Sequence, residues 1–123
     1  MPAPSALAVF DRIISDRGSV YAVSGARVAN RAEIEAALAE LKSARRFARA
    51  THNSWAARLD SEGLKADDGE SGAGAIILRM LQSEGLDDHL VVVTRWYGGK
   101  HLGGDRFRHV IGAVRHYLAH RPT

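Results

Sequence analysis

The stretch of sequence that decides the fold reads Val91-Val92-Val93-Thr94-Arg95-Trp96-Tyr97-Gly98-Gly99-Lys100-His101-Leu102-Gly103-Gly104-Asp105-Arg106-Phe107. An apolar run leads into a loop with four glycines, and the loop opens an amphipathic helix that starts at Asp105. Glycine tolerates positive φ and lets another backbone or a ligand come close. Because loops on rigid scaffolds usually carry function, we predict the functional site at this loop.

Patterns of apolar residues outside the loop predict strands. Leu90 to Arg95 is too apolar to have a solvent-exposed face, so it is expected to be a central strand. Ser19 to Val28 has the β-branched and aromatic residues of another strand. Arg45 to Leu59 is expected to be one extended strand, followed by a polar connection from Asp60 to Gly69. The apolar segment from Ser5 to Ile14 fits either a strand or a short helix.

Capping signals predict three helices. Asn30 with Glu33 three residues later is close to a capping box, and apolar residues then recur at helical spacing from Ile34. A second helix is expected near Ser71, with Gly85 at its C-terminal cap. The third begins at Asp105. This order predicts an α/β protein, an α+β two-layer sandwich with helices packed on one sheet.

Length and composition fit one domain over residues 1–123. The chain has no cysteine, which excludes disulfides and cysteine nucleophiles and agrees with the cytosol. No apolar run approaches a transmembrane helix, and Met1-Pro2-Ala3-Pro4-Ser5 lacks the basic region of a secretory signal. We therefore expect a cytoplasmic protein without a membrane partner. The net charge of +3 allows an anionic partner such as RNA or the ribosome surface without requiring one.

The glycine loop offers backbone N–H groups and cationic side chains to an anion. The candidate backbone N–H groups are those of Tyr97, Gly98, Gly99, Gly103 and Gly104. The candidate cationic side chains are those of Arg95, Lys100 and Arg106. Successive N–H groups can form an anion-binding concavity, to which a helix N-terminus adds positive partial charge. The loop matches neither a Walker A motif nor a dinucleotide fingerprint. The alternative interpretation is that the glycines serve tight turns and close packing, while Asp105 caps the helix and repels anions.

A second group of candidates is Thr51-His52-Asn53, followed by Arg58. His52 can act as a general base or contact a ligand. The alternative is that a neighbouring backbone group satisfies its ring. In a strand, His52 and Asn53 point to opposite faces, so only one of them can join a given pocket.

The acidic turn Asp67-Asp68-Gly69-Glu70 is the third group. Three carboxylates near one glycine can bind a hard cation, but the spacing does not match an EF-hand loop. Acidic residues before a helix also suit its dipole and cap its N–H groups. We therefore predict no metal site. One carboxylate can instead pair with Arg95 or Arg106 by bidentate hydrogen bonding and orient the glycine loop.

A basic stripe runs along the outer face of the last predicted helix. It contains Arg108 and Arg115, His109 and His116, and His120. Such a stripe can contact phosphates. It is also typical of a solvated helix face.

Three ordered motifs resemble the IMPACT family, which is also typified by the bacterial YigZ proteins. They are Ala50-Thr51-His52-Asn53-Ser54-Trp55-Ala56, then Asp67-Asp68-Gly69-Glu70 with Ala73-Gly74, then Val92-Val93-Thr94-Arg95-Trp96-Tyr97-Gly98-Gly99 with Leu102-Gly103 and Asp105-Arg106-Phe107. The resemblance covers about residues 19–120. The third motif is closer to the eukaryotic type than to YigZ.

The resemblance implies a ribosomal-protein-domain-like βαβ fold, with helices on one face of a mixed sheet. Eukaryotic members regulate translation during amino-acid starvation, competing for the ribosome-associated coactivator of the starvation-responsive kinase. The family has no established catalytic activity. Eukaryotic members usually add an N-terminal RWD domain and YigZ proteins a C-terminal ferredoxin-like domain, whereas we expect a single IMPACT-type domain here.

We therefore favour a non-catalytic, translation-associated regulatory or RNA/ribosome-binding module that uses no cofactor. RNA, the ribosome or a translation-regulatory protein would be its partner. One alternative is an enzyme acting on a phosphorylated small molecule, with Arg95 and Arg106 holding the phosphate and His52 or Asp68 moving the proton. The other is a protein–protein interaction module.

We expect the His-Asn segment, the acidic turn and the glycine loop to converge on a single open cleft. The predicted ligand or anion site comprises His52, Asn53, Arg58, Asp68, Gly69, Glu70, Arg95, Tyr97, Gly98, Gly99, Lys100, Gly103, Gly104 and Arg106.

Overall fold

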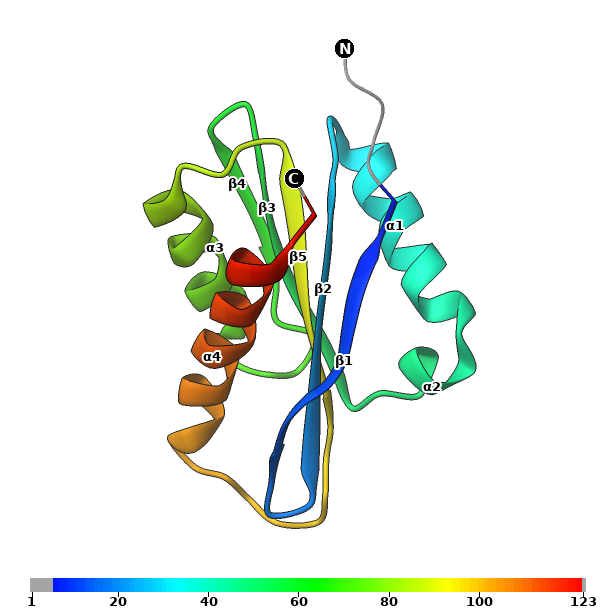
Figure 1. Cartoon of the computed structure of the whole chain (residues 1–123), viewed down its shortest axis with the longest axis vertical. Helices are drawn as coiled ribbons and strands as arrows, with labels where there is room; N and C mark the ends of the chain where they lie inside the picture. The colour runs from blue at the N-terminus through cyan, green and yellow to red at the C-terminus, as the bar shows by residue number, and fades with distance from the viewer. Residues whose placement is uncertain (1–5, 123) are drawn as a thin grey trace.

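One five-stranded antiparallel sheet organises residues 6–122, the part of the chain that the computed structural model describes (Figure 1). Its strands are β1 (Ala8–Asp16), β2 (Ser19–Arg27), β3 (His52–Leu59), β4 (Glu62–Ala66) and β5 (His89–Trp96), in the order β1-β2-β5-β3-β4. The helices are α1 (Arg31–Ser43), α2 (Arg45–Ala48), α3 (Ala73–Glu84) and α4 (Asp105–His120). The strand β5 lies at the centre, as its apolar sequence predicts.

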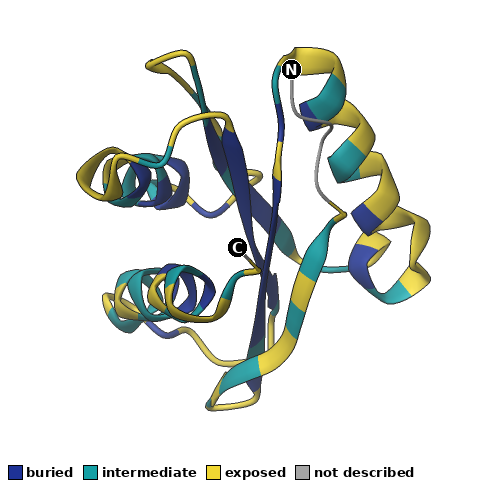
Figure 2. Cartoon of the chain, turned by 45° about the horizontal axis from the view of Figure 1, so that its top comes forward, coloured by how far each residue is buried: buried dark blue, intermediate teal, exposed yellow. Residues whose placement is uncertain are grey.

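The predicted α/β class is confirmed, but the helices cover both faces of the sheet rather than one (Figures 1 and 2). Helices α3 and α4 pack against one face with Tyr21 and Val93, whereas α1 and α2 pack against the other with Ala22 and Val92. The reason is that β5 is buried on both faces at every position before Trp96. Each apolar face of such a strand needs a covering layer. Every strand pairing is antiparallel, so the sheet is not mixed.

Two of the predicted helix caps are confirmed. The side chain of Asn30 accepts from the backbone N–H of Glu33 at 2.9 Å, and Glu33 accepts from the N–H of Ala29 at 2.7 Å, so both ends of the capping motif are used. Gly85 ends α3 in the left-handed conformation with φ of +64°. The helix α4 begins at Asp105 as predicted, but its N-cap is Gly104, and Asp105 forms an ion pair with Arg17 instead.

The predicted single strand from Arg45 to Leu59 is wrong. The first part is the short helix α2, and β3 starts only at His52. A helical turn lets Phe47 enter the core under Trp96, with the two ring centroids 5.0 Å apart. The predicted connection after Leu59 contains β4, which hydrogen-bonds to β3 although its own sequence has little strand character.

The N-terminal apolar segment is a strand, because β1 pairs with β2. Ser5, where that segment begins, and the rest of Met1-Pro2-Ala3-Pro4-Ser5 lie outside the described residues. Across residues 6–122, no helix combines the length and apolar character that a bilayer crossing needs.

Candidate functional site

Strands β3 and β5 place the His-Asn segment directly beside Arg95. His52 is paired with Arg95 and Asn53 with Thr94. Because side chains alternate along a strand, His52 and Arg95 share the face covered by α3 and α4, whereas Asn53 and Thr94 share the other. The prediction that His52 and Asn53 point to opposite faces is confirmed.

Arg95 and Glu70 form a buried ion pair. Nη1 of Arg95 donates to Oε1 of Glu70 at 2.9 Å and lies 3.2 Å from Oε2. Nε2 of His52 lies 3.5 Å from Oε2 of the same carboxylate, and Nη2 of Arg95 reaches Oγ of Ser19 at 3.4 Å. Whole-residue exposure is only 3% for Glu70 and 5% for Arg95. The carboxylate predicted to pair with Arg95 is therefore Glu70, and the pair ties the acidic turn to β5.

The other two carboxylates of the acidic turn bind backbone groups. Asp67 accepts from the N–H groups of Gly72 and Gly74 at 3.0 and 2.8 Å, and these hydrogen bonds hold the pKa of Asp67 below its ordinary value. Asp68 accepts from the N–H of Asn53 at 2.7 Å, and its carbonyl accepts from Nδ1 of His52 at 2.9 Å. The turn thus anchors α3 to β3. Within residues 6–122 no group of three side chains of the metal-ligating types comes together.

Asn53 supports the opposite layer. Its Nδ2 donates to the carbonyl of Phe47 at 3.0 Å, and its Oδ1 accepts from the hydroxyl of Thr94 at 2.7 Å. Only 4% of Asn53 is exposed. It holds α2 against the sheet and does not share a pocket with His52.

The glycine loop serves close packing at one end and open turns at the other. A Cβ on Gly98 would lie 2.0 Å from the carbonyl carbon of Gly18, so only glycine lets this loop lie against the β1–β2 turn. Gly99 and Gly103 have φ of +92° and +57° and face open space, as does Gly104. The packing interpretation therefore holds for Gly98, and the remaining glycines are accessible. Gly69, with φ of +86°, instead faces the ring of His52.

The polar groups under the first turn of α4 are sealed rather than arranged around an open cleft. Tyr21 Oη, Arg95 Nε and Arg106 Nε are buried and have no hydrogen-bond partner. Burial raises the pKa of Tyr21 to about 12, so its phenol stays neutral. Arg106 lies over the ring of Phe107 at 4.6 Å. The three predicted segments do converge, but the expected open cleft is wrong because Arg95 and Glu70 neutralise each other inside the fold.

Arg58 does not join this convergence. It lies near the far end of β3, opposite His89 in the register, and its guanidinium pairs with Asp87 at 3.1 Å. A sequence separation of six residues along a strand places Arg58 about 20 Å from His52.

The predicted basic stripe of α4 is broken up by local contacts. Arg108 pairs with Asp105 at 3.4 Å, and His109 lies 2.7 Å from Asp16. Hydrogen bonds from Arg17 and then His109 lower the pKa of Asp16 to about 2. The rings of His116 and His120 stack with centroids 4.2 Å apart. Most of the stripe is therefore engaged within the chain.

The structure reveals a basic surface that the sequence interpretation missed, which we call the basic arm: Lys42, Arg45, Arg46 and Arg49. In the described part of the chain, Lys42, Arg45 and Arg49 are exposed and form no ion pair. Arg46 lies over the ring of Trp96 at 3.7 Å and pairs with Asp11 at 2.6 Å. The available signal was the run of four cations without an acidic residue from position 42 to 49.

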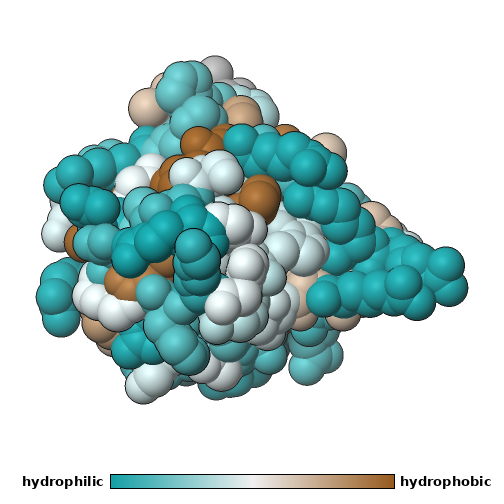
Figure 3. Space-filling model, turned by 90° about the horizontal axis from the view of Figure 1, so that it is seen from below, coloured by the Kyte–Doolittle hydropathy of each residue, from teal (hydrophilic) through white to brown (hydrophobic). Residues whose placement is uncertain are grey.

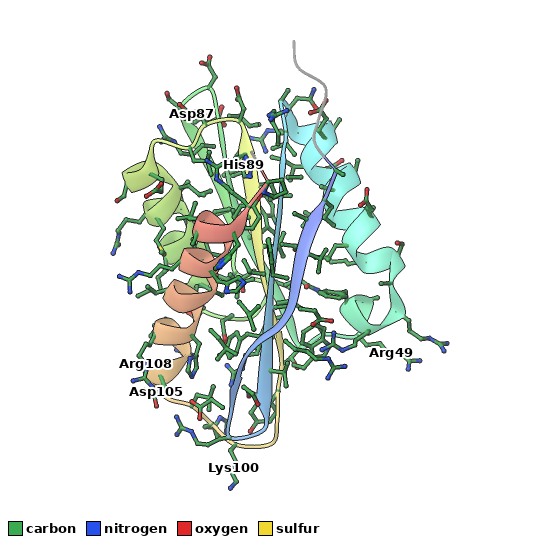
Figure 4. All side chains as sticks on the ribbon, in the orientation of Figure 1. Arg49, Asp87, His89, Lys100, Asp105 and Arg108 are labelled. Carbon is green, nitrogen blue, oxygen red and sulfur yellow. The ribbon has the colours of Figure 1, made fainter. Side chains whose placement is uncertain are left out.

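The basic arm is fastened to the start of the glycine loop. Nε1 of Trp96 donates to the carbonyl of Arg46 at 2.9 Å, and the N–H of Tyr97 donates to Oγ1 of Thr51 at 2.8 Å. Figure 4 shows Lys100 at the lower tip of the molecule, pointing away from the ribbon, and Arg49 in the lower half, at the outer side of α2. Fold and site together define a small α+β domain that presents a basic, glycine-rich end over a sealed polar layer.

Comparison with known proteins agrees with this architecture. Residues 17–118 match the model of the Impact N-terminal domain. The chain is 37% identical over 115 residues to a Protein IMPACT homolog of Caenorhabditis elegans, covering 87% of this chain and 45% of that protein. It is 36% identical over 114 residues to Protein IMPACT of Bos taurus, covering 88% of this chain and 36% of that protein. The chain belongs to the IMPACT family, and it spans less than half the length of these curated relatives.

Two solved structures are similar to the fold. A crystal structure described as that of a hypothetical protein superposes with a TM-score of 0.80 at 22% identity, covering 97% of this chain and 62% of that one, which supports the fold alone. The two-domain translational regulator Yih1 superposes with a TM-score of 0.51 at 31% identity, covering 86% of this chain and 43% of that protein.

Proposed function

We propose that this chain is a translation-associated regulatory module of the cytoplasm that binds RNA or the ribosome surface through the end carrying the glycine loop and the basic arm. The family assignment and the translational regulator among its structural neighbours support the association with translation. The observation that carries the RNA-binding part is the union of exposed cations with exposed aromatic rings at this one end.

The charges of this end are available to phosphates. Lys100 on the loop and Lys42, Arg45 and Arg49 on the basic arm are exposed and form no ion pair within the described residues. Figure 3 views this end directly and shows hydrophilic side chains projecting on the side of α2. Cations that are not neutralised within the protein can contact phosphates and release condensed counterions.

Aromatic rings lie beside those charges. Tyr97 is 44% exposed, and its ring centroid lies 5.8 Å from that of His101. Stacking of exposed rings on unpaired bases contributes affinity without strict sequence preference. The combination favours a single-stranded or looped RNA segment over a continuous duplex.

A binding function fits the sealed layer better than catalysis does. Both ring nitrogens of His52 face oxygen atoms of the protein, and Asp68 accepts from a backbone N–H. These contacts give His52 and Asp68 structural roles between β3 and the acidic turn, which supports the binding module over the enzyme alternative.

The test measures affinity for a labelled single-stranded RNA and for purified ribosomes over a range of salt concentrations. The variant combines Arg45→Gln, Arg49→Gln and Lys100→Gln. Loss of three phosphate contacts should make the negative slope of log K against log salt shallower by about 2 units, at about 0.7 per contact. The matched control combines Lys65→Gln, Arg79→Gln and Arg115→Gln, which removes the same charge from exposed positions elsewhere.

The proposal fails if both triple variants bind RNA and ribosomes as the parent chain does. Equal losses in the two variants would also contradict it, because they would reflect net charge alone. Binding to a ribosomal protein without RNA, at unchanged salt slope, would support the protein-interaction alternative instead.

A further inference from the structure

A cavity of about 420 Å³ lies at the end of the sheet opposite the glycine loop. Residues of β1, β2, the α3–β5 connection and the end of α4 line it. Figure 4 shows His89, one of the lining residues, at the upper end of the ribbon, far from Lys100 at the lower end. A volume of this size is within the range of small-molecule sites. The proposed RNA-binding surface does not use it.

A buried polar pair, His89 and Tyr117, lies among the lining residues. Nε2 of His89 lies 2.6 Å from the hydroxyl of Tyr117, and the two residues are 7% and 1% exposed. Gly25 makes room for the tyrosine, because a Cβ there would lie 2.3 Å from Cζ of Tyr117. Burial raises the pKa of Tyr117 to about 12, so its phenol can donate to Nε2. The proton of the neutral imidazole then resides on Nδ1, and this N–H is available as a hydrogen-bond donor.

Two arginines act on this pair. Burial, then Arg121 and Arg27, lowers the pKa of His89 to about 4, and Arg121 also acts on Tyr117. Both arginines line the cavity. Arg121 makes no side-chain ion pair to any residue in the described range.

Two aspartates also belong to the lining. Asp87 pairs with Arg58 at 3.1 Å, and Asp88 accepts from the N–H of Asp60 at 3.2 Å. The remaining lining is mainly apolar, with Ala8 and Leu86 among its residues. An apolar wall with a few convergent donors is the usual composition of a site for an organic ligand.

We propose that this cavity binds a small organic anion, with its phosphate or carboxylate group on Arg121 and its body against the His89–Tyr117 pair. Guanidinium groups match the geometry of both kinds of oxyanion. The ligand must be small enough for the cavity, which excludes an RNA chain but admits a mononucleotide or a short dicarboxylate.

The experiment titrates the isotopically labelled full chain with inorganic phosphate, adenosine monophosphate and succinate, and follows amide chemical shifts. Saturable shifts at Gly25, His89 and Arg121 are expected for at least one probe. The ranking of the probes separates phosphate from carboxylate as the recognised group. Arg121→Gln should weaken that binding about tenfold, the loss of roughly one charge-assisted hydrogen bond. Arg115→Gln, a charge-matched change at an exposed position of the same helix, should not.

Absence of saturable shifts with all three probes would overturn the proposal, as would equal binding by Arg121→Gln and the parent chain. Shifts confined to the glycine loop would overturn it too. The first two outcomes leave RNA binding unaffected, because the cavity and the glycine loop lie at opposite ends of the sheet, whereas shifts confined to the glycine loop would support anion binding at the proposed RNA-binding surface.

Discussion

Arg95 and Glu70 are 25 residues apart in the chain, yet their side chains meet at 2.9 Å inside the fold. The pair joins the central strand β5 to the turn before α3, and His52 lies against the same carboxylate. Three motifs that look like parts of a binding site are therefore held together by a structural ion pair. This makes substitution of Arg95 an unsuitable test of ligand binding by itself.

Glu70→Ala should destabilise the fold by about 3–5 kcal/mol, because it leaves the guanidinium of Arg95 buried and unpaired. Urea unfolding followed by circular dichroism measures the change. Arg108→Ala breaks an exposed pair with Asp105 and should cost less than about 1 kcal/mol. Similar losses in the two variants would contradict the buried role of Glu70.

Gly98→Ala should destabilise the fold by about 2 kcal/mol or more, because the added Cβ would overlap the carbonyl carbon of Gly18. The matched control is Gly104→Ala, where φ is −68° and no atom lies within 4 Å of the added methyl group. We expect that control to change stability by less than about 1 kcal/mol. Thermal unfolding of both variants compares the two glycines, and a stable Gly98→Ala protein would argue against tight packing of the loop.

Asn53→Ala should cost about 2–3 kcal/mol, because the hydroxyl of Thr94 and the carbonyl of Phe47 lose their buried partner. Limited proteolysis should also show earlier cleavage near α2, which Asn53 holds to the sheet. Asn30→Ala removes one exposed helix-capping bond and is expected to cost about 1 kcal/mol. A ligand-binding role for Asn53 would instead predict nearly unchanged stability.

Stability should fall as the pH drops from about 6.5 to about 4. The pKa of His89 is lowered to about 4 in the fold, chiefly by burial, so the unfolded chain binds more protons in this range. The contribution of neutral His89 to the free energy of unfolding is fully present above the pKa of histidine in the unfolded chain. It is lost as the pH falls through the lower pKa of His89 in the fold. The difference between the pKa values of His89 in the unfolded and folded chain corresponds to a loss in the free energy of unfolding on the order of 3 kcal/mol.

Urea unfolding at a series of pH values measures this dependence, and His89→Gln is the comparison. The variant cannot titrate at this position, so its curve should be flatter between pH 6.5 and 4. His116 has a pKa lowered by burial and by His120, and its titration acts in the same direction in both proteins. If the free energy of unfolding of the parent chain and of His89→Gln falls in parallel with pH, His89 is not the source of the loss of stability.

Local patterns were sufficient to predict several elements of this fold. Leu90 to Arg95 was predicted as a central strand because its apolar run has no polar face, and β5 is buried on both sides. Asn30 with Glu33 predicted the start of α1, since capping depends on residues within one turn. The same reasoning failed for α2 and β4. Both are short: α2 depends on a distant partner, Trp96, and β4 forms by pairing with the adjacent strand β3 although its own sequence has little strand character.

The candidate site shows the same division. Strand alternation alone placed His52 and Asn53 on opposite faces, because the period of a strand is a local property. Which carboxylate would pair with Arg95, and whether that pair would be exposed, depended on how the acidic turn packs beside β5. The burial of Glu70 and the attachment of the basic arm to Trp96 arise from contacts between segments far apart in the chain.

By itself, the sequence determined the α/β class, the central strand, the starts of α1 and α4 and the end of α3. These follow from periodicity, capping and glycine chemistry over a few residues. Only the tertiary structure decided that helices cover both faces, that Arg95 is neutralised, that Arg58 lies at the other end of β3 and that a cavity opens beside His89. Burial and charge pairing are set by packing between distant segments, and local sequence carries no direct record of them.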